Sequence, residues 1–251
     1  MKILVLGNGF MGARIAKYFS CDVSSGEISK ITKEVLDGYD VVINTIAKTN
    51  VDWCEENKFE TFRVNTYGAV WIAAETRGKY VFISSGCIFK SLHAGDIKKE
   101  SAIPEPECMH TYSKVIAERM IQQINPQAII IRPRLLTSFE PHEKNTIDKI
   151  LKYVKLTSSQ ESFTVLEDML PILDELIMTY AFGIYNIANS GTISPSEIAH
   201  LFGKKHLLTT AKELAADGRV ERVSVVMGSD RLLRLPDIRN RILEIKGYRK
   251  L

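Results

Sequence analysis

Six residues near the start of the chain constrain its fold more than any other segment. They form a G-x-G-x-x-G pattern, Gly7-Asn8-Gly9-Phe10-Met11-Gly12. A continuous apolar run, Ile3–Leu6, precedes the pattern, and helical apolar spacing follows it over Phe10–Phe19. A strand, a glycine turn and a helix in this order are typical of a site for the pyrophosphate of a dinucleotide. There Gly7 permits a tight turn, Gly9 lets the pyrophosphate approach the backbone, and Gly12 lets helix and strand pack closely.

The same change of apolar period recurs along the first half of the chain. Apolar runs that favour strands alternate with the spacing that favours helices. The predicted strands cover residues 21–23, 41–43, 80–83 and 128–131, and the predicted helices cover residues 28–36, 59–73 and 116–124. This alternation predicts an α/β fold of the Rossmann type, a doubly wound parallel sheet with helices on both faces. Only 28 residues separate Gly12 from Val41, so we expect part of the first half of the sheet to be missing.

The alternation of strand and helix patterns ends after Arg132-Pro133, and the rest of the chain predicts a small C-terminal lobe. The predicted elements are a loop and helix over 135–156, a short strand over 163–166, a helix over 170–180, a last sheet strand over 185–188 and a terminal helix over 239–250. Ser194-Pro195 supplies an N-cap and a first helical residue for one more helix. We therefore assign residues 1–133, with a returning strand near 183–190, to the nucleotide-binding domain. Residues 134–182 and 191–251 form the lobe.

Composition and charge exclude several functional classes. The 251 residues carry 33 Lys and Arg against 30 Asp and Glu, a formal charge of +3 with interspersed signs, so nucleic-acid binding is not expected. The four cysteines form no C-x-x-C pair and the histidines lack ligand spacing, so no metal site is expected. No apolar run approaches the ~18 residues of a membrane span, and the opening run is too short for a signal peptide. We expect a cytoplasmic protein.

The second predicted strand bears on the choice between NAD and NADP. An acidic residue after this strand holds the adenosine ribose of NAD in many such folds. Asp22 lies ten residues past Gly12 and is one candidate for this role, although it fits a helix or turn cap equally well. No arginine is obviously placed for the 2′-phosphate of NADP. The sequence therefore leaves NAD and NADP both open.

Five further segments carry a resemblance to a known family. They are Asn44–Asp52, Val64–Ala69, Val81–Phe89, Ser113–Glu118 and Gly183–Gly191. In content and order they resemble the extended short-chain dehydrogenase/reductases, and within these the dTDP-4-dehydrorhamnose reductases, over about residues 1–200. The resemblance implies NAD(P)H-dependent reduction of a 4-keto nucleotide sugar in carbohydrate biosynthesis. It also implies that the C-terminal lobe binds this substrate.

The resemblance implies a set of catalytic residues, with one departure. The family has a Ser or Thr after the fourth sheet strand, and then a Tyr and a Lys spaced Y-x-x-x-K. The hydroxyl and the phenol hold the substrate oxygen, the phenol exchanges the proton, and the lysine lowers the pKa of the phenol and holds the nicotinamide ribose. Ser85 and Lys114 match, but His110 stands where the tyrosine is expected. Tyr112 is two residues from Lys114, about 200° around a helix, so those two side chains cannot face one pocket.

Three interpretations of this departure remain open. First, a protonated His110 gives its proton to the alkoxide formed by hydride attack, and activity then falls as the pH rises toward neutrality. Second, the helix begins in a different register and Tyr112 enters the site. Third, the site is silent and the protein is a nucleotide-binding regulatory or partner subunit, like the regulatory subunit of methionine adenosyltransferase in this branch. A nucleotide-sugar epimerase or dehydratase of the same superfamily is a further alternative.

Other contacts follow from the resemblance with less detail. The cofactor is expected to contact the segment after the third strand and an asparagine behind the active site, which are Thr45, Ala47, Lys48 and Asn65, besides Lys114. The expected substrate residues are Ser85, Gly86, Cys87, Arg132 and Thr137. Gly86 and Cys87 depart from the family pattern and change the expected substrate pocket. Asp168 is interpreted as a helix N-cap. A homodimer is compatible with the sequence.

Overall fold

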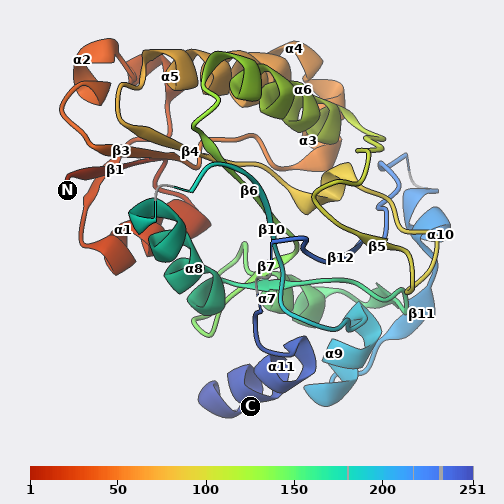
Figure 1. The fold of residues 1–251 in the computed structure, drawn as a ribbon. Helices are drawn as coiled ribbons and strands as arrows, with labels where there is room; N and C mark the ends of the chain where they lie inside the picture. Colours follow the sequence, from red (N-terminus) through yellow and green to blue (C-terminus); the bar gives the residue numbers. More distant parts are fainter. Residues whose placement is uncertain (180, 217, 232–233, 251) are drawn as a thin grey trace. The chain divides into compact units, whose positions relative to one another are not determined.

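The computed structural model describes residues 1–179, 181–216, 218–231 and 234–250. The chain divides into two compact units (Figure 1). The first contains residues 1–88, 106–132 and 170–185, and the second contains residues 89–105, 133–169 and 186–251. The sequence-based division placed residues 89–105 with the first domain and residues 170–182 with the lobe.

A six-stranded sheet organises the first unit. Its strands are β1 (Ile3–Leu6), β2 (Asp22–Ser24), β3 (Val41–Asn44), β4 (Lys79–Ile83), β6 (Ile129–Pro133) and β10 (Gly183–Ile187), in the order β10-β6-β4-β3-β1-β2. The pairs from β2 through β6 are all parallel. The segment between Gly12 and Val41 contributes β2 alone, where a complete half-sheet has two strands beyond the first. The predicted shortening is therefore confirmed.

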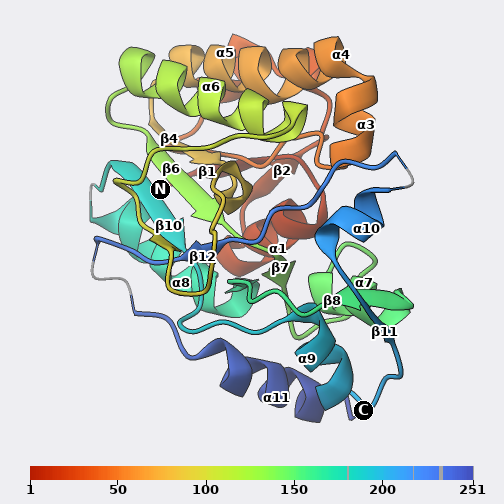
Figure 2. The same ribbon diagram turned by 90° about the vertical axis from the view of Figure 1, so that its right-hand side faces the viewer.

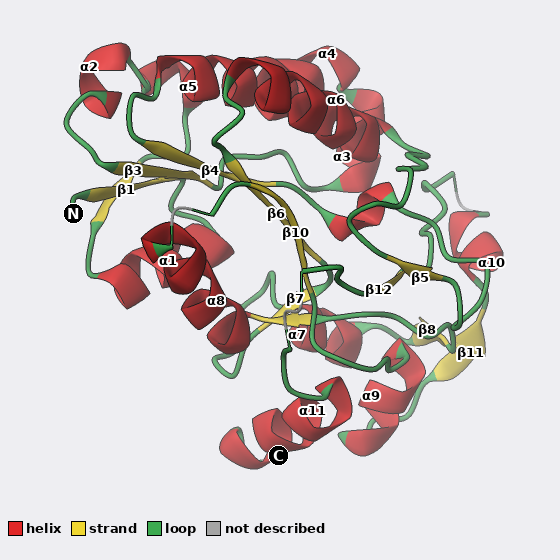
Figure 3. Ribbon diagram, viewed as in Figure 1, coloured by secondary structure: helices red, strands yellow, loops and turns green. Residues whose placement is uncertain are grey.

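Helices cover both faces of this sheet (Figures 1 and 3). One face carries α4 (Lys58–Phe62), α5 (Ala69–Glu75) and α6 (Met109–Ile124), with α3 (Val51–Glu56) beside them, and the other carries α1 (Phe10–Phe19) and α8 (Leu166–Met178). A π-helical segment, η2 (Arg63–Gly68), joins α4 to α5 and packs against α6. The apolar core includes Leu4, Leu6, Val42, Ile72, Tyr80, Phe82, Ile121 and Ile130.

Several predicted elements differ from the observed ones. The helix predicted over 28–36 is split into a 3₁₀ turn, η1 (Ile28–Lys30), and a short α2 (Lys33–Leu36), because the Ile31 and Thr32 between them are extended. The strand predicted over 163–166 is limited to β9 (Thr164–Val165), and α8 begins at Leu166 rather than at residue 170. The predicted end of that helix, Tyr180, lies outside the described residues. The loop and helix expected over 135–156 contain β7 (Leu136–Thr137), α7 (Thr146–Lys152) and the start of β8 (Lys155–Thr157).

The described residues of the second unit form a core of their own and three small parallel sheets. The paired strands are β7 with β9, β8 with β11 (Leu207–Thr209), and β5 (Ile97–Lys98) with β12 (Val226–Met227). Three of its helices, α7, α9 (Pro195–Leu201) and α11 (Ile238–Tyr248), contribute core residues such as Ile147, Ile198 and Ile242, and a short α10 (Ala211–Ala215) follows β11. Figure 2 shows these elements from a second direction. The predicted cap of α9 is present, since the Ser194 hydroxyl accepts from the Glu197 amide at 3.1 Å.

Two kinds of feature are absent from the part of the chain that the structure describes. No helix there is long and apolar enough to span a membrane. No cluster of three or more His, Cys, Asp or Glu side chains in the same residues could hold a metal ion.

Candidate active site

The glycine turn between β1 and α1 has the geometry of a phosphate cradle. Gly7 has a φ of +99°, which an L side chain rarely adopts, and Thr45 Oγ1 lies 2.8 Å from the carbonyl oxygen of Leu6 behind the turn. A Cβ on Gly12 would lie 1.9 Å from the Gly7 carbonyl oxygen, so only glycine lets α1 approach the turn this closely. A Cβ on Gly9 would meet nothing within 4 Å. The Gly9 backbone therefore borders open space at the N-terminus of α1, where an anion is favoured.

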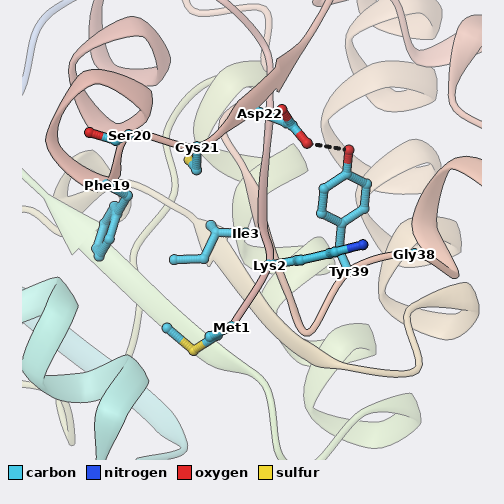
Figure 4. Close-up of a pocket in the computed structure, with 9 residues that line it drawn as sticks. All are labelled: Met1, Lys2, Ile3, Phe19, Ser20, Cys21, Asp22, Gly38 and Tyr39. Carbon is cyan, nitrogen blue, oxygen red and sulfur yellow. Dashed lines mark hydrogen bonds between the residues drawn. The ribbon is translucent and has the colours of Figure 1, made fainter.

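Asp22 lies at the wrong end of β2 for a ribose contact. It pairs with Leu4, whereas Ser24 pairs with Leu6, the last residue of β1 before the glycine turn. The Asp22 carboxylate accepts a hydrogen bond of 2.8 Å from the Tyr39 hydroxyl and lines a hollow of about 430 Å³ at the amino end of β1 (Figure 4). The expectation that Asp22 holds the adenosine ribose is therefore corrected. Ser24, Ser25 and Gly26 occupy the strand end beside the turn, with a Cβ on Gly26 3.9 Å from Gly7 Cα.

The segment after β3 is held by the π-helical segment η2. The buried Asn65 side chain accepts from the Lys48 amide at 2.7 Å and donates to the Lys48 carbonyl at 3.0 Å. The side-chain nitrogen of Asn65, Nδ2, also donates to Ser113 Oγ of α6 at 3.1 Å. Ala47 is half-buried between Thr45 and this clamp, and the Lys48 ammonium lies 5.1 Å from the centre of the Trp53 ring. Asn65 thus fixes the loop from residue 45 to 48 against α6, at the carboxyl edge of the sheet.

His110 lies in the first turn of α6 and is 6% exposed. Its Nδ1 lies 3.1 Å from the same Lys48 carbonyl that accepts from Asn65. Because a carbonyl only accepts, this contact requires a proton on Nδ1 and makes Nε2 the nitrogen that exchanges protons in the neutral ring. The imidazole is therefore oriented by the backbone after β3. The Ser113 hydroxyl donates to the His110 carbonyl at 2.7 Å and links this turn to Asn65.

Lys114 lies one helical turn after His110 and is 2% exposed. Its ammonium donates to the Ile83 carbonyl, the last of β4, at 2.8 Å and lies 4.6 Å from the centre of the Phe82 ring. Burial lowers the pKa of Lys114 to about 8, while the charges of Glu118 and Cys54 act in the opposite direction. The ammonium therefore reaches the carboxyl end of a central strand.

The loop after β4 carries the predicted hydroxyl group. Ser85 is half-buried, and its Oγ accepts a hydrogen bond of 3.1 Å from the Cys87 amide. Gly86 and Cys87 begin a 3₁₀ turn, η3 (Gly86–Ile88), which packs against α6. Ser85 and Lys114 are therefore both anchored at the end of β4. Cys87 forms no disulfide and is half-buried.

Tyr112 points away from this arrangement. Its side chain is 50% exposed, whereas His110 and Lys114, two residues to either side, are buried. This is the geometry expected for residues about 200° apart on a helix. In this structure α6 presents His110, and not Tyr112, on the face that carries Lys114.

Three other predicted residues have local roles in the structure. Arg132 lies inside β6, is 2% exposed, and forms a salt bridge of 2.5 Å with Glu118. Thr137 is fully buried in the second unit, and its hydroxyl donates to Asn145 at 2.9 Å. Asp168 lies within α8, where its carboxylate accepts from Arg241, so the expectation of an N-cap is wrong. The substrate contacts of Arg132 and Thr137 stay predictions.

Sequence reasoning missed the residues that support this site. Glu118 and Ser84 are buried behind Lys114, and Asn44 and Tyr80 are joined by a hydrogen bond of 2.8 Å under the β3–β4 pair. Two signals could have revealed Glu118. It lies four residues after Lys114, and Arg132 interrupts an otherwise apolar strand and therefore needs a buried partner of opposite charge.

Comparison with known proteins agrees with the fold and the order of the motifs. One family model, described as the RmlD substrate binding domain, matches residues 1–221. A bifunctional dTDP-4-dehydrorhamnose 3,5-epimerase/dTDP-4-dehydrorhamnose reductase of Arabidopsis thaliana is 31% identical over 165 residues, which cover 62% of this chain and 54% of the plant protein. A trifunctional rhamnose-synthesis protein of the same plant is 30% identical, and the match covers 25% of it. The chain thus spans about half of the first relative and a quarter of the second.

Solved structures show the same fold. The crystal structure of the L780 UDP-rhamnose synthase from Acanthamoeba polyphaga mimivirus superimposes with a TM-score of 0.88 at 22% identity and covers 99% of both chains. A dTDP-4-dehydrorhamnose reductase from Bacillus anthracis, solved in complex with NADP, has a TM-score of 0.83 at 19% identity, over 98% of this chain and 99% of that one. The predicted Rossmann-type fold is confirmed.

Proposed function

Because the chain belongs to the family of the RmlD substrate binding domain, we propose that it is an oxidoreductase that reduces a 4-keto nucleotide sugar with NADPH or NADH. The observation that carries the proposal is the shared face of α6. There the buried His110 and Lys114 lie one turn apart, with the lysine ammonium at the end of the strand that leads to Ser85. The glycine turn opens at the same carboxyl edge of the parallel sheet.

When bound, NAD(P)H supplies the hydride that reduces the keto carbon. Gly9 and the N-terminus of α1 hold its pyrophosphate, and Lys114 holds the nicotinamide ribose. Ser85 donates a hydrogen bond to the keto oxygen, and His110 transfers a proton from Nε2 to that oxygen as it gains negative charge. The Nδ1 contact with the Lys48 carbonyl at 3.1 Å supports this role because it holds a proton on Nδ1 and so assigns the exchangeable proton to Nε2. The products are the sugar alcohol and NAD(P)⁺.

The end of β2 supports acceptance of NADPH. A carboxylate there binds the ribose hydroxyls of NAD and repels the 2′-phosphate of NADP. This chain has Ser24 and Ser25 at that position, and its nearby carboxylate, Asp22, is bonded to Tyr39 at the other end of the strand. We therefore expect NADPH to serve at least as well as NADH.

The decisive experiment measures consumption of NADPH with UDP- and dTDP-linked 4-keto-6-deoxy sugars. We expect turnover by the wild type, and a decrease in kcat of about 10²–10⁴-fold in His110→Gln, with little change in cofactor affinity. Tyr112→Phe is the matched control on the exposed side of α6 and should retain wild-type rates. The rate should fall as the pH rises from about 6 to about 9. Equal rates in His110→Gln and the wild type would exclude this role for the imidazole.

The same assay separates the alternative functions. A silent regulatory or partner subunit would bind NADPH and consume none with any 4-keto sugar nucleotide. An epimerase or dehydratase would convert its substrate without net oxidation of the cofactor. The named activity of the Arabidopsis relative includes a 3,5-epimerase, so products should be identified as well as counted.

A homodimer and a cytoplasmic location complete the proposal. An exposed apolar stripe on α6 supports dimer formation; its members, spaced four residues apart, are Tyr112, Ile116, Met120 and Ile124. Light scattering should show a dimer for the wild type and a monomer for Met120→Glu. Leu92→Glu, which changes an exposed leucine of the second unit, should remain dimeric. None of the four cysteines forms a disulfide, which is consistent with a reducing compartment.

A further inference from the structure

A buried ion pair lies directly behind Lys114. Glu118 is one turn further along α6, and Arg132 reaches it from β6 with donor–acceptor distances of 3.0 Å from Nε and 2.5 Å from Nη2. Both residues are 2% exposed. The Ser84 hydroxyl also donates to Glu118 Oε1. Three elements, α6, β6 and the end of β4, therefore meet at one carboxylate.

Stability alone does not account for this arrangement. Removing two charges from water costs several kcal/mol per ion, and well-packed apolar residues often stabilise a fold as well or better. An ion pair at this position therefore calls for another role. The position of Glu118 supplies one, because this residue follows Lys114 by about one turn of α6.

The contacts of Glu118 reach the catalytic residues through the backbone. Ile83 and Ser84 are consecutive, and they are bound by Lys114 and Glu118 respectively. Ser85 follows immediately. Two neighbouring residues of the β4 end are thus tied to two neighbouring turns of one face of α6, and the position of Ser85 relative to that face is fixed by both.

The charge of Glu118 acts on Lys114 as well. Around Lys114, α3 supplies Cys54, α6 supplies His110 and Glu118, and the end of β4 supplies the Ile83 carbonyl and the Phe82 ring. Burial lowers the pKa of the lysine to about 8, and the charge of Glu118 opposes this decrease more strongly than that of Cys54. Without the Glu118 carboxylate, the Arg132 guanidinium would be a second buried cation near Lys114, with no carboxylate to offset its charge.

We propose that Glu118 is a positioning residue: its carboxylate keeps the Lys114 ammonium charged, and its contacts with Arg132 and Ser84 hold the strand end that carries Ser85. The proposal rests on the reductase function for its catalytic consequence. The effect on the lysine does not depend on turnover and can be measured separately.

The first test follows the titration of Lys114 by NMR in protein labelled with ¹³C at the lysine Cε, with Lys114→Met to assign the signal. We expect a midpoint near pH 8 in the wild type and a decrease of about one pH unit or more in Glu118→Gln. Glu118→Gln/Arg132→Gln removes both charges, so it avoids an unpaired buried guanidinium if the single variant fails to fold. Its midpoint should fall by less. An unchanged midpoint in both variants would overturn the electrostatic role.

The second test compares pH profiles of kcat and KM. In Glu118→Gln the rise in KM for NADPH that follows deprotonation of Lys114 should begin at a lower pH, by the same shift that NMR gives. Ser84→Ala retains both charges, so its NMR midpoint should stay in place while kcat decreases about tenfold as the strand end loosens. An unchanged kcat in Ser84→Ala would overturn the anchoring role. If the wild type lacks turnover and the midpoint still falls in Glu118→Gln, the reductase function fails and the coupling of Glu118 to Lys114 stands.

Discussion

Lys114 is a buried charge, and replacing it measures its contribution to the stability of the fold independently of its role in the reaction. Burial lowers its pKa from 10.5 to about 8. Between these two pH values the unfolded chain holds a proton that the folded protein has released, so the free energy of unfolding rises with pH. Below about pH 8 both states are protonated, and the folded protein bears the full cost of a buried ammonium.

The pKa difference of about 2.5 corresponds to about 3 kcal/mol in the free energy of unfolding. Lys114→Met keeps most of the side-chain volume and lacks this contribution. It also leaves the Ile83 carbonyl without the ammonium donor, which costs about 1–3 kcal/mol at every pH. The difference in the free energy of unfolding between wild type and Lys114→Met should therefore change with pH instead of staying constant. From about pH 7 to about pH 10.5 the wild type should gain about 3 kcal/mol relative to Lys114→Met.

Urea unfolding at a series of pH values measures this difference. Both tryptophans, Trp53 and Trp71, lie in the first unit with Lys114, so their fluorescence follows the relevant part of the chain. Burial also lowers the pKa of Lys79, but this group is present in both proteins and cancels in the difference. The pKa of Cys54 is raised by burial and lowered by the Lys114 charge, so Cys54 is replaced by Ala in both proteins. Lys17→Met, which removes an exposed lysine of α1, is the control and should run parallel to the wild type. Parallel profiles for wild type and Lys114→Met would refute the reasoning.

Three further predictions follow from contacts in the first unit. Gly12→Ala should lower the free energy of unfolding by about 1–3 kcal/mol and abolish NADPH binding, because its Cβ would lie 1.9 Å from a backbone oxygen. Gly9→Ala should weaken NADPH binding but leave the free energy of unfolding within about 1 kcal/mol of wild type, because its Cβ would meet nothing within 4 Å. Ser24→Asp should lower the ratio of kcat/KM for NADPH to that for NADH by about tenfold or more, whereas Asp22→Asn, at the other end of β2, should leave the ratio unchanged. Tyr80→Phe should lower the free energy of unfolding by about 1–3 kcal/mol, because the buried Asn44 amide and the Ala69 carbonyl both lose their partner; a change below about 0.5 kcal/mol in chemical denaturation would contradict the assigned bonds.

The sheet of the first unit could be predicted because its central strands, β1, β3, β4 and β6, are buried on both faces. Runs such as Ile3–Leu6 and Val41–Ile43 contain no polar residue and are closed by polar or glycine residues, a pattern that few other structures produce. The helix expected over 28–36 failed for a different reason. Apolar spacing shows which residues face the core, but it does not show that Ile31 and Thr32 between them remain extended.

The beginning of α6 shows why the site itself was harder to predict. Apolar spacing indicated a helix over 116–124, and the structure extends it back to Met109. The missing turns contain buried polar residues, which are His110, Thr111, Ser113 and Lys114. Their polarity made them resemble solvent-facing positions, because burial of a polar side chain depends on partners elsewhere in the chain. Those partners, Lys48, Asn65 and Ile83, come from three other elements.

The buried polar residues at the start of α6 are also the strongest structural argument for an active site. A helix that only covered the sheet would be more stable with apolar residues at these positions, since each buried charge or amide requires a matching partner. Here the buried polar side chains have such partners. Asn65 holds the Lys48 carbonyl that orients His110, and Glu118 and the Ile83 carbonyl position Lys114. Networks of this kind hold a reactive geometry at the expense of stability. A protein with no chemistry at this face would therefore be expected to tolerate Lys114→Met and Glu118→Gln without functional loss, whereas the proposed reductase would not.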